Sequence, residues 1–138
     1  MNKGIYLDVD GSIKLIDTPA IQGRDWRWFS QQIGCDWIEN VYPRGLKAPY
    51  MMVVDEEARL KERPVINFLA SWLYEAHMHG SPICGNCLIM QQVDTDEGPD
   101  IDGIPQIEAE ILAKYLSDHL SQAIDAVSLR LGNQLVRA

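Results

Sequence analysis

Four residues of the types that bind zinc lie within eleven positions in the second half of the chain. They are His77, His79, Cys84 and Cys87, spaced His-x-His-x-x-x-x-Cys-x-x-Cys. Histidine nitrogens and cysteine sulfurs are the usual ligands of a structural zinc ion. However, residues two apart on a helix or three apart on a strand point in different directions. Two hypotheses therefore stay open, a zinc-stabilised structural module and two buried thiols beside exposed histidines, and no cofactor other than zinc is expected.

A second group combines arginine with tryptophan at Arg24, Trp26, Arg27 and Trp28, with Arg44 further along. On one short helix the two indoles cannot both face the core, so we expect one of them at a surface. An exposed indole beside guanidinium groups suits an anion or a stacked base. The alternative is that arginine side chains cover a partly buried indole. The sequence thus predicts a candidate site for a small anionic, nucleotide-like ligand or for a partner protein.

An acidic segment follows between Asp94 and Gly103. Its carboxylates are those of Asp94, Asp96, Glu97, Asp100 and Asp102. Alternating oxygen ligands suit Ca²⁺, but the spacing differs from an EF-hand and Pro99 interrupts it. We interpret the segment as a solvated loop and a boundary between residues 1–103 and 104–138. Its charge leaves a third hypothesis open, which is mimicry of a nucleic acid.

No arrangement of residues indicates catalysis. Cys35 stands next to Asp36, and negative surroundings raise the pKa of a thiol, which makes it a poor nucleophile. Asp8 and Asp10 resemble the strand-end aspartates of haloacid-dehalogenase-type phosphotransferases, but Asp10-Gly11 favours a tight hairpin. The glycines are too scattered to form a phosphate-binding loop. We therefore favour a protein without enzymatic activity and assign no catalytic residue.

The elements expected to position these residues alternate between short strands and short helices. We expect two short helices at 26–33, capped by Asp25, and at about 65–76, opened by Pro64. Alternating or continuous apolar residues predict strands at 5–9, 12–16, 37–42, 50–54 and 83–93. The expected fold is α+β, with a mixed or antiparallel sheet of about five strands, the two short helices on one face and a long C-terminal helix.

The C-terminal helix begins at Pro105 and keeps an apolar stripe for about thirty residues, or roughly 45 Å. The stripe consists of Ile107, Ile111, Tyr115, Leu116, Leu120, Ile124, Val127 and Leu131, and continues to Leu135. A domain of this size cannot easily cover so long a stripe. The helix should therefore either lie across the sheet or pair with its copy, and we favour a homodimer in which these residues form the interface.

Composition narrows the class of protein further. The chain has 138 residues, 46% of them hydrophobic, and a formal net charge of −8. This suits one globular domain with an ordinary core and argues against general binding to nucleic acid, which requires clustered Lys and Arg. No stretch has the length of a signal peptide or membrane span, and three cysteines are an odd number. We expect a cytoplasmic protein without a disulfide framework or membrane contact.

Several short motifs, in order, carry a resemblance to a known family. They are Ile33-Gly34, Ile38-Glu39-Asn40-Val41-Tyr42-Pro43, Val53-Val54-Asp55-Glu56, Pro64-Val65-Ile66-Asn67 and Pro82-Ile83-Cys84-Gly85-Asn86. Residues from about 5 to 93 resemble the domain of unknown function numbered thirty-eight forty-six. That family occurs in bacteriophages, plasmids and conjugative elements, and has no established activity. The resemblance implies an accessory protein of a mobile element inside a bacterial cell, and many such proteins antagonise host defence by binding a host protein.

Overall fold

The computed structural model describes residues 2–19, 25–76, 78 and 80–137, the final 132–137 by backbone alone. It confirms an α+β fold. Its elements are β1 (Lys3–Leu7), β2 (Ile13–Asp17), α1 (Trp26–Ile33), β3 (Ile38–Val41), β4 (Tyr50–Asp55), α2 (Phe68–Leu73), β5 (Cys87–Thr95), β6 (Gly98–Asp102), α3 (Gln106–Asp118) and α4 (Leu120–Arg137). A 3-10 turn (Ala58–Leu60) lies between β4 and α2.

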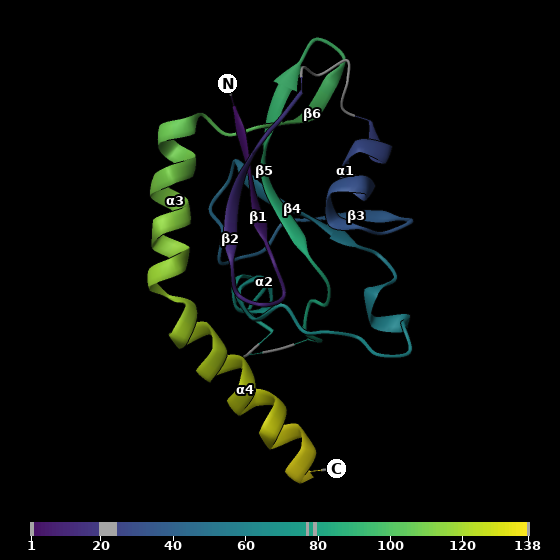
Figure 1. Cartoon of the computed structure of the whole chain (residues 1–138), viewed down its shortest axis with the longest axis vertical. Coiled ribbons are helices and arrows are strands. Elements are labelled where there is room, and N and C mark those ends of the chain that lie inside the picture. Colours follow the sequence, from purple (N-terminus) through teal and green to yellow (C-terminus); the bar gives the residue numbers. More distant parts are fainter. Residues whose placement is uncertain (1, 20–24, 77, 79, 138) are drawn as a thin grey trace.

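The strands form one antiparallel sheet in the order β2-β1-β5-β4-β3, with β6 also paired to β5. Gln91 of β5 pairs with Tyr50 of β4 on one side and with Asp102 of β6 on the other. Consequently β6 lies on the same side of β5 as β1 and extends the sheet beyond the end of β1. Long β5 is the central strand on which the other hairpins assemble (Figure 1).

Helices cover both faces of the sheet, because successive strand residues point to opposite sides. Met52 and Ile89 face a core shared with α2, α3 and α4. Met51 and Leu88 face a second core closed by Phe29 of α1. Each such fully buried side chain contributes about 1.5–3 kcal/mol of hydrophobic stabilisation. The expectation that both short helices share one face is therefore wrong: α1 and α2 lie on opposite faces (Figure 1).

The hairpin expected at Asp10-Gly11 is confirmed. Leu7 of β1 pairs with Ile13 of β2, and the Gly11 N–H donates to the Asp8 carbonyl at 3.0 Å. Gly11 has φ 93°, a conformation that glycine adopts without steric cost. The helix predicted at 26–33 is also confirmed, with the Asp25 carboxylate accepting the N–H groups of Arg27 and Trp28.

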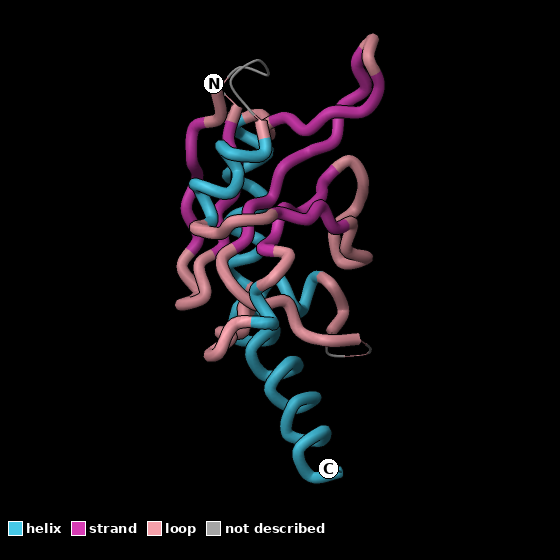
Figure 2. The backbone as a smooth tube through the Cα atoms, turned by 90° about the vertical axis from the view of Figure 1, so that its right-hand side faces the viewer, coloured by secondary structure: helices cyan, strands magenta, loops and turns pink. Residues whose placement is uncertain are grey.

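The acidic segment is a hairpin, so its interpretation as a loop is wrong. β5 continues to Thr95, the chain turns at Asp96 and Glu97, and β6 returns alongside. Gly98, with φ 108°, permits this turn, and the Thr95 hydroxyl donates to its carbonyl. Hydrogen bonding between the β5 and β6 backbones therefore forms strands in a segment whose acidic composition predicts a loop. The β5–β6 hairpin reaches out from the body of the molecule (Figure 2).

The second helix is shorter than the apolar spacing predicts. Asn67 is buried and caps α2 by accepting the Ala70 N–H at 3.1 Å, so the helix begins at Phe68 rather than Val65. The Asn67 amide also donates to the carbonyls of Leu7 and Gly85. Pro64 thus precedes an extended segment and not the helix. The strand predicted at 83–93 likewise begins only at Cys87.

The C-terminal helix is two helices, and the prediction of one continuous helix is wrong. The break is at His119, whose backbone leaves the helical region. Its ring stacks on Trp72 of α2 at 5.7 Å and contacts Tyr115 at 4.1 Å. This aromatic contact lies at the change of direction between α3, which lies along the sheet, and α4, which passes α2 and projects beyond the body (Figure 1). Within the described residues, no helix is both long and apolar enough to cross a membrane.

Candidate functional site

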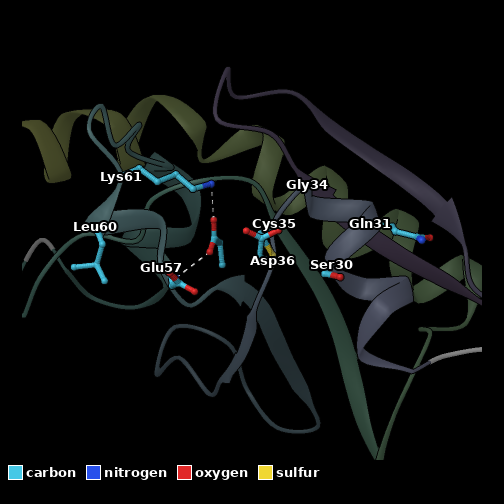
Figure 3. Close-up of a pocket in the computed structure, with 9 residues that line it drawn as sticks. Ser30, Gln31, Gly34, Cys35, Asp36, Glu57, Leu60 and Lys61 are labelled. Carbon is cyan, nitrogen blue, oxygen red and sulfur yellow. Dashed lines mark hydrogen bonds and ion pairs between the residues drawn. The ribbon is translucent and has the colours of Figure 1, made fainter.

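A hollow of about 530 Å³ opens where the end of α1 meets the segment that follows β4. Its walls come from three parts of the chain, as Figure 3 shows. They are α1 with the turn after it, the last residue of β4, and the 3-10 turn with Lys61 beyond it. The lining residues are Ser30, Gln31, Gly34, Cys35, Asp36, Asp55, Glu57, Leu60 and Lys61.

Asp55 fixes the shape of this hollow. Its side chain is only 6% exposed, and its two oxygens accept from the Lys61 ammonium at 2.8 Å and from the Glu57 N–H at 2.9 Å. The pKa of Lys61 is raised because this carboxylate stabilises the charged ammonium. The Lys61 side chain is 56% exposed, so solvent weakens the pair, and its main effect is to hold the loop against the end of β4.

Cys35 is not an activated nucleophile. Burial raises the pKa of its thiol to about 11, and the negative charge of Asp55 adds to this increase. The thiol donates to the Trp37 carbonyl at 3.4 Å. Because the thiolate is the reactive form, such a thiol reacts slowly at neutral pH. The sequence-based expectation for Cys35 agrees with this environment, although burial outweighs the charge of Asp36 as its cause.

The charge of the hollow is negative. Its ionisable side chains include three carboxylates, those of Asp36, Asp55 and Glu57, against the single ammonium of Lys61. Asp36 and Glu57 are exposed. The hollow therefore offers hydrogen-bond acceptors to a cationic or donor group. A small anion would be repelled from it.

Two exposed indoles lie beside the hollow. Trp26 is one helical turn before Ser30 of the lining, and Trp37 directly follows Asp36. Their rings stack with centroids 5.7 Å apart and planes inclined by 15°, while 45% of Trp26 and 55% of Trp37 remain exposed. The Arg27 guanidinium lies 5.2 Å from the Trp26 ring centroid. We call Trp26, Arg27 and Trp37 the indole surface.

The structure brings together only part of the predicted arginine and tryptophan group. Trp26 and Arg27 are exposed neighbours, whereas Trp28 is half-buried and packs edge-on against Phe29. Arg44 lies in a turn whose Gly45 N–H donates to the Leu73 carbonyl of α2, on the opposite face of the sheet from α1.

Arg24 lies outside the described residues, and Arg27 pairs with Asp25 at 3.1 Å. Trp37 was missed because it was assigned to a strand, where alternation placed its side chain on one face together with those of Val41 and Glu39. Only the polar Asp36 before it hinted at this exposure, because Ile38 after it is apolar.

The predicted zinc ligands are only partly placed. His77 and His79 lie outside the described residues, while Cys84 and Cys87 are buried. Burial raises the pKa of both thiols, and Asn67 donates to the Cys87 sulfur at 3.8 Å. In the described part of the chain, no three His, Cys, Asp or Glu residues are grouped so that they could hold a metal ion. The zinc hypothesis stays a prediction.

The predicted dimer stripe divides between two sides of the C-terminal helices. Leu116 and Val127 are buried in the chain's own core, and Leu120 and Leu131 are half-buried. Four others are exposed on the outer side: Ile107, Ile111, Tyr115 and Ile124. The side chain of Leu135 lies outside the described part of the chain. The expected long stripe therefore covers the chain's own sheet with one half and leaves the other half unpartnered in the monomer.

The motifs that carry the family resemblance meet around Asp55. Besides the main hollow, two smaller ones of about 150 and 190 Å³ border this residue. Their walls include Gly34, Pro64-Val65, Pro82-Ile83-Cys84 and Gly85-Asn86. Segments far apart in the sequence thus converge at one end of the sheet.

Comparison with known proteins gives one family and no annotated relative. No curated protein and no solved structure matches the chain. A family model described as Domain of unknown function (DUF3846) matches residues 3–117, which extends the resemblance at 5–93 through β6 and nearly all of α3. Because this match covers most of the chain, the protein belongs to that family of domains of unknown function.

Proposed function

We propose that this protein is a non-enzymatic binding protein that holds a partner protein through the indole surface and the acidic hollow beside it. The observation that carries the proposal is the exposed stack of Trp26 on Trp37, with the Arg27 guanidinium over the Trp26 ring. Tryptophan and arginine dominate the residues that contribute most to protein–protein affinity. Two large rings that already pack on each other lose little conformational entropy when a partner covers them.

The charges next to the indole surface favour a partner with basic side chains. Asp36 and Glu57 are exposed at the hollow, and the whole chain carries a formal net charge of −8. Opposite charge on a partner increases the rate of association and fixes its orientation. A small anionic ligand is less well supported, because Arg27 already pairs with Asp25 and the neighbouring hollow is acidic.

A binding role also fits the chemistry of the hollow better than catalysis does. The Cys35 thiol is held in its unreactive form, and the buried carboxylate of Asp55 is occupied by Lys61 and a backbone N–H. As the family resemblance implies, the protein would be an accessory protein of a phage or other mobile element. Its partner would then be a host protein in the bacterial cytoplasm.

The test compares three immobilised forms of the full chain with the same bacterial lysate. They are the wild type, the Trp26→Ala/Trp37→Ala variant and a control, Leu129→Ala, which is 67% exposed on α4 and does not line the hollow. Quantitative mass spectrometry should find a protein retained by the wild type and the control but lost by the double variant. Truncating a central tryptophan costs about 2 kcal/mol, roughly a thirtyfold weaker complex.

Purified partner should then bind with an affinity that falls as salt rises, and Asp36→Asn/Glu57→Gln should reduce that dependence. The proposal fails if the double variant, shown to be folded by circular dichroism, retains every protein that the wild type retains. It also fails if a nucleotide and not a protein is released from the wild type alone.

A further inference from the structure

The outer side of α3 carries an apolar row that stays largely exposed in the monomer, although Tyr115 also contacts the ring of His119. Ile107, Ile111 and Tyr115 are 72%, 67% and 47% exposed, and they are four residues apart. At 100° per residue, this row lies opposite the residues that pack on the sheet, Ala109 and Leu116. α3 is therefore apolar on two sides, although only one is needed to cover the sheet.

We propose that this row is the interface with a second copy of the chain, in which two α3 helices pack antiparallel about a twofold axis at Ile111. Such an interface must be self-complementary, so that each residue meets its symmetry counterpart. Here Ile111 meets Ile111 of the second copy, and Ile107 lies opposite Tyr115. This inference is independent of the indole surface, which lies on the other face of the sheet.

A hollow beside the row could receive the Ile107 side chain of the second copy. It has a volume of about 220 Å³ and is lined by Gly45, Trp72, Leu73, Glu75 and Tyr115. The antiparallel arrangement brings Ile107 of the second copy to Tyr115 at the edge of this hollow. Each copy thus contributes one projecting apolar side chain, Ile107, and one recess walled in part by Trp72 and Tyr115, about 12 Å apart along the helix.

Charges along one flank of the row also match in this arrangement. Glu110 and Lys114 lie on the same side of the row, and a twofold axis at Ile111 places Lys114 about 3 Å along the helix axis from Glu110 of the second copy. Both are exposed, and their present contacts, to Gln106 and to Asp118, are within their own helix. Such surface contacts are weak and can be exchanged for intermolecular ones.

Sedimentation velocity of the full chain, over about 1 to 100 µM protein, tests the proposal. The wild type should reach a mass of twice 15.6 kDa. Ile111→Glu places two carboxylates together at the axis and should weaken the dimer at least about a hundredfold. The matched control, Leu60→Glu, adds the same charge at an 82% exposed residue outside the interface and should leave the dimer unchanged.

Charge reversal tests the orientation of the helices. Lys114→Glu should weaken the dimer, and the double reversal Glu110→Lys/Lys114→Glu should restore it, which a merely structural effect would not do. A wild type that stays monomeric at 100 µM, or a dimer that Ile111→Glu leaves intact, overturns the proposal. If changing Trp26 and Trp37 abolishes partner binding but leaves the dimer intact, that result bears on the proposed function and not on the dimer.

Discussion

Cys35 shows how the neighbours of one side chain decide its chemistry. Its thiol is partly buried and lies near the carboxylate of Asp55, and both effects raise its pKa. They outweigh the opposing effects of the Lys61 ammonium and of the hydrogen bond to the Trp37 backbone. The same environment that makes Cys35 unsuitable for catalysis protects it from oxidation, because oxidation also proceeds through the thiolate. Cys35 is therefore held in its protonated, less reactive form.

This inertness can be measured by alkylation. With a pKa of about 11, the folded thiol is roughly 0.1% ionised at pH 8, against about a quarter for an ordinary cysteine. The thiolate of a thiol with a higher pKa is a stronger nucleophile, which partly offsets its lower abundance. Labelling of folded Cys35 should therefore be about tenfold slower than labelling of the same residue in the urea-unfolded chain. Iodoacetamide labelling, resolved at Cys35 by mass spectrometry, should keep rising from pH 7 through pH 10. A plateau below pH 9 would contradict the inference.

Local chemistry in the sequence predicts elements well where one residue decides their ends. Asp25 caps α1 and Gly34 ends it with φ 74°, as short-range preferences predict. Prediction failed where contacts between residues far apart in the sequence decide where an element begins and ends. Asn67 shortens α2 by bonding to Leu7 and Gly85, which are far away in the sequence. The acidic hairpin forms because β6 finds a partner in β5, which composition does not indicate.

The site was predicted less well than the fold for the same reason. Trp26 and Arg27 could be suspected from their spacing, but the stack requires Trp37, which follows the helix and a turn. The stripe of the C-terminal helices was visible in the sequence. Its division into a core half and an outer half depends on where the sheet lies, and on the break at His119 that Trp72 stabilises. Neither could be inferred from periodicity alone.

Because α4 buries one side and exposes the other, substitutions on its two sides should differ in their effect on stability. Val127 is 1% exposed and packs in the layer with α2, whereas Leu129, two residues on, is 67% exposed. Val127→Ala should lower the free energy of unfolding by about 1–2 kcal/mol, because it leaves a cavity in the core. Leu129→Ala should change it by less than about 0.5 kcal/mol. Urea unfolding followed by circular dichroism compares them, and equal costs would show that α4 is not anchored through Val127.

In the whole molecule, the two proposed interfaces lie on opposite faces of the sheet. α1, the turn after it and the segment after β4 form the indole surface and its hollow at one face, while α3 lies at the other (Figure 1). In the proposed dimer the two α3 helices meet, so each copy's indole surface would stay open to solvent. A dimer of this kind offers two separate sites to partner molecules, which increases avidity toward a multimeric partner.

The net charge makes a prediction about the stability of the whole chain. Twenty acidic residues face twelve basic ones, and folding brings the excess carboxylates closer together. Asp94, Asp96 and Glu97 concentrate part of this charge, all exposed, at the tip of the β5–β6 hairpin. Raising NaCl from 10 to 200 mM shortens the screening length from about 30 Å to below 10 Å, and should therefore raise the melting temperature by roughly 3 °C.

The variant Asp94→Asn/Asp96→Asn/Glu97→Gln should be more stable than the wild type at 10 mM NaCl, with a smaller gain at 200 mM, because screening already removes part of the repulsion there. Differential scanning calorimetry at pH 7 measures both proteins. The control variant Asp118→Asn/Glu108→Gln removes two carboxylates that bond to Lys114 and Tyr50, respectively. It should therefore not be more stable than the wild type. If the melting temperature of the wild type fell with salt instead, favourable ion pairs would outweigh the repulsion. The acidic hairpin would then contribute to folding, and its charge could not be explained solely as a surface kept for a basic partner.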